Sequence, residues 1–134
     1  NGMGKYIAEK TIKLMIKSGK IIKDSNILII GLTFKENCPD HRNTKVVDII
    51  KEIKDYGAII DVYEPWIDEK DKGYYNYNFV DNPFENSKKY DAIVIAGGHD
   101  KFKTRTQEQY ESLIKDQKII IDVKGIVPTP SWKL

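Results

Sequence analysis

The chain has few of the residues that build disulfide or metal frameworks. Its 134 residues include one cysteine, Cys38, and two histidines, His41 and His99. A single cysteine cannot close an internal disulfide, and this set gives no ordinary zinc site, so we predict no bound metal. No apolar run approaches the roughly 20 residues that a membrane-spanning helix needs, and no signal peptide is visible. We therefore expect a cytoplasmic protein without a membrane partner.

An excess of charge of one sign is also lacking. The 22 basic side chains nearly balance the 20 acidic ones, which leaves a formal net charge of +2. Lysines and acids are interspersed, as is typical of a solvated surface, and no basic stripe with interleaved aromatics is present. We expect no nucleic-acid partner. The length is enough for one domain with a real core.

Two common nucleotide-binding motifs are missing. The chain has neither G-x-G-x-x-G nor G-x-x-x-x-G-K-[ST], so any nucleotide has to be held in another way. Cys38 follows Lys35 by three residues, a setting that favours a reactive thiolate. A lone loop cysteine is more often incidental, and we predict no catalytic residue in this chain.

Short apolar runs rich in Ile and Val alternate with helical patterns. Such runs suit parallel strands buried on both faces, and the alternation predicts a Rossmann-like, doubly wound α/β domain with a mostly parallel sheet flanked by helices. The expected strands are residues 27–30, 59–63, 92–96 and 119–123, and the expected helices are 4–18, 44–56 and 106–115, with Gly19 and Gly57 ending the first two.

Two further segments have less regular patterns. Residues 66–87 carry the aromatic cluster Tyr74, Tyr75 and Tyr77. Aromatic rings can stack on a base or a sugar, but they more often cover a sheet face or edge, and we favour this second interpretation. Residues 127–134 contain two prolines and are expected to form an extended terminus.

The loop after the first strand carries cations. The apolar run breaks at Gly31, Lys35 and Arg42 follow, and a helix begins near Asn43. In a parallel sheet this loop lies at the carboxyl edge, where the next helix directs its positive dipole end, so the pattern favours a phosphate ligand. An ordinary surface loop remains the alternative. Donors suited to phosphate and sugar oxygens are Thr33, Lys35, Asn37, Arg42, Asn43 and Thr44.

Six short motifs follow one another along most of the chain. They are GLTFKEN (31–37), PDHRNTK (39–45), DVYEPW (61–66), YDAIVIA (90–96), HDKF (99–102) and IDVKG (121–125). In this order and spacing they resemble the C-terminal, UDP-binding domain of the UDP-glucose/GDP-mannose dehydrogenase family. The branch that is most similar oxidises UDP-N-acetylhexosamines (mannosamine, galactosamine or glucosamine) for surface polysaccharides such as capsule.

The resemblance implies a domain organisation. Residues 1–22 match the C-terminal part of the central linking helix, which forms much of the dimer contact, and residues 23–134 match the UDP-sugar-binding domain. A first helix packed simply on its own sheet is the alternative. The implied partners are a UDP-sugar substrate and the missing N-terminal NAD-binding and central domains of the same polypeptide, with a homodimer at full length.

The resemblance also implies roles for individual residues. Lys35 matches a lysine that contacts the nucleotide-sugar, and Phe34 matches the aromatic beside it. Arg42 matches an arginine that reaches the NAD pyrophosphate. Lys124 stands where many relatives have arginine, which leaves its substrate contact open. The catalytic cysteine of the family lies in a G-x-x-C-F-P-like motif that this chain lacks.

The activity implied for the full-length protein is that of an NAD-dependent UDP-sugar 6-dehydrogenase, an oxidoreductase that converts the sugar C6 alcohol to a carboxylate by two hydride transfers. The fragment alone is expected to be inactive and to hold no cofactor. A free-standing nucleotide-binding or regulatory module is one alternative. A flavodoxin-like or receiver-like domain is another, although residues 95–98 (IAGG) lack the aspartate that a receiver needs.

Overall fold

The computed structural model describes residues 2–32 and 44–134. The helices are α1 (Met3–Lys17), α2 (Thr44–Asp55), α3 (Glu69–Tyr74), α4 (Asp100–Lys103) and α5 (Gln107–Glu111), with one 3₁₀ turn, η1 (Pro83–Glu85). The strands are β1 (Asn26–Ile30), β2 (Ile59–Tyr63), β3 (Asn78–Phe79), β4 (Ala92–Ile95), β5 (Ile120–Asp122) and β6 (Trp132–Lys133).

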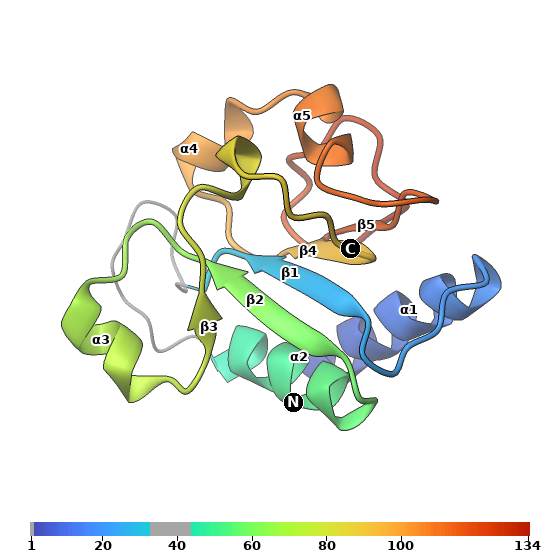
Figure 1. Ribbon diagram of the computed structural model, residues 1–134, viewed down its shortest axis with the longest axis horizontal. Helices are drawn as coiled ribbons and strands as arrows, with labels where there is room; N and C mark the ends of the chain where they lie inside the picture. Colours follow the sequence, from blue (N-terminus) through green and yellow to red (C-terminus); the bar gives the residue numbers. More distant parts are fainter. Residues whose placement is uncertain (1, 33–43) are drawn as a thin grey trace.

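The six strands form one parallel sheet in the order β3-β2-β1-β4-β5-β6 (Figure 1). From β1 the chain adds β2 and β3 on one side, and then returns to place β4, β5 and β6 on the other. This reversal next to β1 is the switch point of a doubly wound sheet. The predicted fold class is confirmed.

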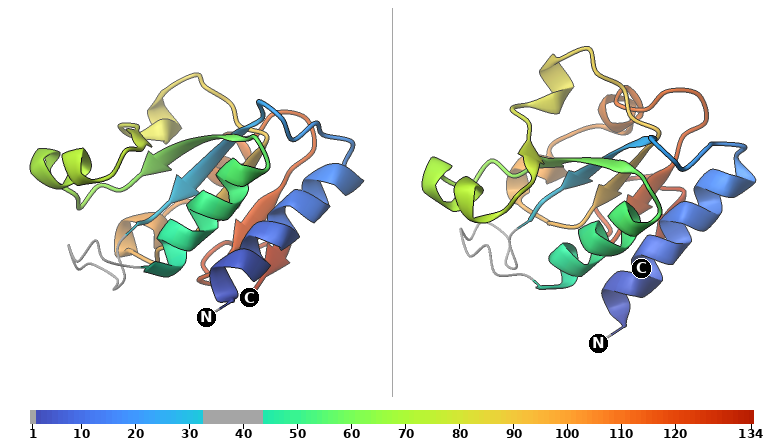
Figure 2. Two further views of the ribbon diagram at one scale, coloured as in Figure 1. Left: turned by 90° about the horizontal axis from the view of Figure 1, so that it is seen from below. Right: turned by 60° about the horizontal axis from the view of Figure 1, so that its bottom comes forward.

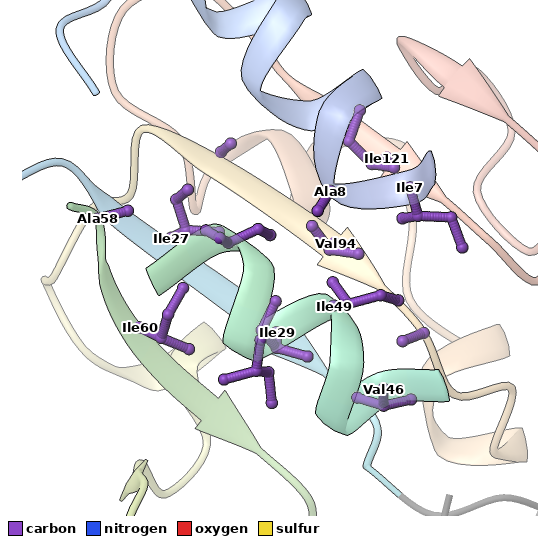
Figure 3. Close-up of a cluster of buried hydrophobic side chains, with 14 of the residues drawn as sticks. Ile7, Ala8, Ile27, Ile29, Val46, Ile49, Ala58, Ile60, Val94 and Ile121 are labelled. Carbon is purple, nitrogen blue, oxygen red and sulfur yellow. The ribbon is translucent and has the colours of Figure 1, made fainter. Parts of the chain in front are cut away.

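Helices α1 and α2 lie side by side against one face of the sheet (Figure 2). Ile7 and Ala8 of α1 and Ile49 of α2 face Ile29 of β1 and Val94 of β4 in a fully buried cluster (Figure 3). Helix α1 therefore packs on the core of this domain, as its apolar stripe requires. The assignment of residues 1–22 to a linking helix stays a prediction.

The opposite face of the sheet is covered by α4, α5 and their connections (Figure 1). Leu28 and Ile30 of β1 point to this side, so that β1 is buried on both faces. Tyr110 and Phe102 complete the layer, and the Tyr110 hydroxyl donates to the Phe102 carbonyl oxygen at 2.6 Å. That bond satisfies the one polar atom that the buried ring brings into the core.

Several short elements differ from expectation. The helix predicted over residues 106–115 is shorter in the structure, where α5 ends at Glu111. The expected extended tail pairs with β5 as the sixth strand, β6, which was not predicted. Strand β3 and helices α3 and α4 were also missed. Elements of two to six residues contain too few side chains to establish a period.

The aromatic cluster lies at the β3 edge of the sheet. The rings of Tyr75 and Tyr77 stack at a centroid distance of 5.3 Å, and Phe79 follows at 6.0 Å from Tyr77. These three rings are half-buried and pack against the core on the α2 side, whereas Tyr74 is 79% exposed. The cluster covers the sheet edge, in agreement with the favoured interpretation.

Two backbones approach closely at the switch point. An ideal Cβ added at Gly31 would lie 2.4 Å from the Gly97 Cα, and Gly31 has a φ of +90°. Only glycine meets both requirements without strain, since a side chain would collide with the neighbouring backbone and would disfavour this φ. The close packing of the two backbones after β1 and β4 therefore requires glycine at position 31.

Gly31→Ala should lower the free energy of unfolding by about 2–4 kcal/mol, because left-handed strain adds to overpacking. Urea denaturation measures the change. Gly73→Ala is the matched control, since Gly73 has nothing within 4 Å of the added Cβ. The control should be neutral or stabilising by up to about 1 kcal/mol. Equal effects of the two substitutions would contradict the close approach.

A buried carboxylate lies within β2. Asp61 is 1% exposed, and its oxygens accept hydrogen bonds from Lys88 Nζ, Asn78 Nδ2 and the Tyr90 hydroxyl, each at 2.7 Å. Burial alone raises the pKa of Asp61, but the hydrogen bonds from Lys88, Asn78 and Tyr90 outweigh it and hold the pKa below its ordinary value of 3.8. Burial and the bond to Asp61 raise the pKa of Tyr90.

The lowered pKa of Asp61 links stability to pH. A carboxyl group whose folded-state pKa is lowered stabilises the fold above its unfolded pKa, and this contribution is lost as the pH falls through the folded pKa. Asp61→Asn should therefore be less stable at neutral pH and should lose less stability than the wild type between about pH 5 and pH 2. Urea unfolding at a series of pH values checks this, and parallel curves would contradict it.

Candidate functional site

The candidate site lies at the carboxyl ends of β1 and β4, where strand order reverses. Gly31 follows β1 and Gly97 follows β4, and both backbones belong to this edge. In open α/β sheets, ligands bind in the crevice outside such a switch point. A pocket of about 220 Å³ lies beside it, over the ends of β2 and β3. Its lining residues are Tyr63, Glu64, Pro65, Ile67, Lys72, Val80, Asp81, Asn82 and Lys101.

A buried carboxylate–imidazole pair underlies this edge. Glu64 directly follows β2, and its Oε1 lies 3.2 Å from His99 Nε2, with both side chains fully buried. The same Oε1 accepts the backbone N–H of Leu32 at 2.8 Å, and Oε2 accepts the backbone N–H of Trp66 at 3.0 Å. Glu64 therefore ties together the chain segments that leave β1, β2 and β4.

The hydrogen bond to Leu32 limits how an anion can be held. In nucleotide-binding loops, backbone N–H groups after the first strand cradle the phosphates. Here the Leu32 N–H already donates to Glu64, and the Leu32 side chain is fully buried. The Leu32 N–H is therefore not available to an anion at this edge.

A second carboxylate organises the turn after β5. The buried Asp122 accepts backbone N–H groups from Gly125 at 2.8 Å and Val127 at 2.7 Å, and a weaker contact from Lys124 at 3.2 Å. These bonds fix a turn in which Gly125 has a φ of +71°. The Lys124 side chain is exposed at the same edge of the sheet as Gly31. Strand β5 lies two strands from β1, which places the two strands about 10 Å apart in the sheet.

A pocket of about 530 Å³ lies at the amino end of the sheet and is lined mainly by the α1–β1 and α5–β5 connections. The Lys20 ammonium group sits there and donates to the carbonyl oxygens of Asp91, Lys115 and Gln117 at 2.5, 3.0 and 2.7 Å. Burial lowers the pKa of Lys20, and the nearby Asp91 partly opposes this. Lys20 links the α1–β1 connection to the α5–β5 connection and to Asp91, so we interpret this pocket as a structural feature and not as a ligand site.

Three of the four site residues predicted from the sequence, Phe34, Lys35 and Arg42, lie outside the described residues. Lys124 is the fourth, and it lies at the expected edge. The Glu64–His99 pair was missed as a site feature, although both residues lie in motifs that carry the family resemblance, DVYEPW (61–66) and HDKF (99–102). Its signal in the sequence is a polar residue shortly after each of two apolar strands, with Glu64 one residue after β2 and His99 four residues after β4, since such ends meet at one edge of a parallel sheet.

Comparison with known families decides the identity of the domain. The family model described as "UDP-glucose/GDP-mannose dehydrogenase family, UDP binding domain" matches residues 28–129. The chain belongs to this family. The match begins in β1 and continues past β5, so it includes both glycines of the switch point and the turn that carries Lys124.

Curated relatives within the UDP-glucose/GDP-mannose dehydrogenase family are longer. A UDP-N-acetyl-D-glucosamine 6-dehydrogenase from Salmonella typhi is 39% identical over 128 residues, covering 96% of this chain and 30% of that protein. Protein CapL from Staphylococcus aureus is 37% identical, covering 95% of this chain and 30% of that protein. The chain thus spans about 30% of the length of these relatives.

Solved structures share the fold of the family domain. An NDP-N-acetyl-D-galactosaminuronic acid dehydrogenase from Methanosarcina mazei matches with a TM-score of 0.80 at 23% identity, over 93% of this chain and 26% of that one. A UDP-D-ManNAc dehydrogenase from Pyrococcus horikoshii matches with a TM-score of 0.76 at 22% identity, over 98% of this chain and 30% of that one.

Within residues 2–32 and 44–134, no group of three or more His, Cys, Asp or Glu side chains is arranged to hold a metal ion. Over the same residues, no helix has the length and apolar character needed to cross a membrane.

Asp122→Ala should destabilise the domain by about 1–3 kcal/mol, because buried backbone N–H groups of the β5 turn lose their acceptor. Asp81→Ala, which removes an exposed carboxylate, is the control and should change stability by less than about 0.5 kcal/mol. Thermal or urea unfolding of both variants gives the comparison. An unchanged Asp122→Ala variant would show that the turn does not depend on this side chain.

Proposed function

We propose that the chain is the UDP-sugar-binding part of an NAD-dependent nucleotide-sugar 6-dehydrogenase, which oxidises a UDP-N-acetylhexosamine to its uronic acid for polysaccharide biosynthesis, including capsule. The observation that carries the proposal is the family match over the sheet and its switch point. The names of the Salmonella typhi and Pseudomonas aeruginosa relatives, both UDP-N-acetyl-D-glucosamine 6-dehydrogenases, support the substrate class.

The chemistry of the described residues supports a division of labour in which NAD binds mainly elsewhere. The chain has no G-x-G-x-x-G, and the Leu32 N–H at the first strand end is occupied by Glu64. A dinucleotide cradle of the usual kind does not fit here. We assign NAD binding to the remainder of the polypeptide, with Arg42 as the contribution of this chain to the pyrophosphate.

The substrate site would use cationic side chains. In this proposal Lys35 and Lys124 approach the UDP phosphates from the loops after β1 and β5, and Phe34 packs beside the nucleotide-sugar. Arginine binds a phosphate through two parallel hydrogen bonds, whereas lysine acts as a movable point charge. The lysine at position 124 should therefore make a weaker and less directional contact than an arginine would.

The whole enzyme would be assembled from parts beyond this chain. The N-terminal NAD-binding domain and the central domain of the same polypeptide would close over the carboxyl edge of the sheet. A cytoplasmic homodimer is the expected full-length form, with residues 1–22 contributing to the linking helix. The 134-residue chain alone would bind the nucleotide without oxidising it.

Titration of the isotopically labelled chain with UDP tests the proposal. Amide shifts should centre on residues 31–44 and on the turn around Lys124, and Lys124→Ala should weaken UDP binding by about five-fold through loss of one partly screened charge contact. Lys23→Ala is the matched control, because Lys23 is exposed at the opposite end of the sheet. Equal weakening by both variants, or no shifts at millimolar UDP, would contradict the proposed site.

A further inference from the structure

We propose that Glu64 and His99 are positioning residues for nucleotide-sugar binding, which fix the backbone at the carboxyl end of β1. The proposal rests on the function proposed above, and it assigns a role to two side chains that the predicted ligand contacts do not include. Both side chains are fully buried, and their polar atoms lie 3.2 Å apart at the switch-point edge of the sheet.

The contacts of Glu64 reach three strand ends. Its Oε1 accepts from Leu32, the second residue after β1, and its Oε2 accepts from Trp66, the third residue after β2. His99, which follows β4 and precedes α4, approaches the first of these oxygens. A single carboxylate therefore sets the positions of three segments where they emerge at the ligand-binding edge.

Packing holds this pair in one orientation. The His99 ring lies edge-on to Phe102 at a centroid distance of 5.2 Å, and the Trp66 ring lies at a centroid distance of 6.0 Å from it. Trp66 is 46% exposed, so it presents part of its ring to solvent beside the edge while Glu64 holds its backbone. A shift of Glu64 would move Leu32 and Trp66 together.

The position of Leu32 matters because of what lies on either side of it. The Gly97 backbone confines Gly31, since a Cβ added at Gly31 would lie 2.4 Å from the Gly97 Cα. On the other side of Leu32, the sequence continues to the predicted ligand residues. A ligand site held at two points along the backbone is pre-organised, which lowers the ordering cost of binding. Without the hydrogen bond from Leu32 to Glu64, this described stretch of backbone would keep the close approach of Gly31 to Gly97 but would lose its second attachment.

Glu64→Gln changes the hydrogen bonding with little change in volume. The glutamine amide has one oxygen, so its NH₂ group replaces either Oε1, where it faces the Leu32 N–H and His99 Nε2, or Oε2, where it faces the Trp66 N–H. Asp91→Asn is the matched control, because Asp91 Oδ2 accepts the backbone N–H of Asn26 at 2.8 Å at the opposite end of the same strand. Both substitutions replace a carboxylate that accepts a backbone N–H at or just beyond an end of β1, but only Glu64 lies at the proposed site.

The test measures UDP affinity and urea stability for the wild-type chain and for both variants. Glu64→Gln should weaken UDP binding about ten-fold, as expected when a buried donor loses its acceptor at a binding site, whereas Asp91→Asn should lower stability and leave the affinity unchanged. The amide signals of Leu32 and Trp66 should shift in Glu64→Gln alone. His99→Gln, which keeps a donor toward Glu64, should lose less affinity and provides the second variant if Glu64→Gln does not fold.

The outcomes separate the two proposals. Wild-type affinity in a folded Glu64→Gln variant would overturn the positioning role and leave the proposed function intact. Equal losses of affinity in Glu64→Gln and Asp91→Asn would also overturn it, since affinity would then follow stability. Loss of affinity in His99→Gln as large as in Glu64→Gln would overturn the primary role of the carboxylate. A wild-type chain that does not bind UDP would overturn the proposed function, and the positioning role with it.

Discussion

The structure depends on a central strand that is dry on both faces. In β1, Ile27 and Ile29 face the α1 and α2 layer, whereas Leu28 and Ile30 face the layer that contains Tyr110. Parallel pairing with β2 and β4 satisfies its backbone along its length. Because no water reaches either face, the donors at the two ends of β1 need partners from the protein itself.

Carboxylate side chains from neighbouring segments accept the hydrogen bonds of the backbone N–H groups at the two ends of β1. Asp91 accepts the Asn26 N–H at the amino end, and Glu64 accepts the Leu32 N–H at the carboxyl end. Each acid lies beside an adjacent strand, so the sheet order that buries β1 also brings its end groups together. At the amino end the Lys20 ammonium group donates to three carbonyl oxygens and so links the segments that meet there, opposite the candidate site.

The sequence predicts the parts of this arrangement that repeat a local pattern. The Ile- and Val-rich runs identify β1, β2, β4 and β5, and the helical period identifies α1 and α2. Strand β6 was missed because two residues of a proline-containing tail carry no period, and its pairing depends on β5. The contact between Glu64 and His99 spans 35 positions, so only the strand order could reveal it.

Occupation of the Leu32 N–H by Glu64 has a consequence for nucleotide recognition on this fold. A glycine-rich loop binds phosphate through backbone donors, and such binding requires those donors to be free. Here the first strand end uses its donor to stabilise the sheet, and Gly31 serves the close approach to Gly97. In the proposed function, phosphate is bound by cationic side chains such as that of Lys124, whose contacts are less directional than a backbone cradle. In the proposed positioning role, Glu64 holds the backbone at Leu32 and Trp66, so this edge of the sheet keeps its shape although the cation contacts are weakly directional.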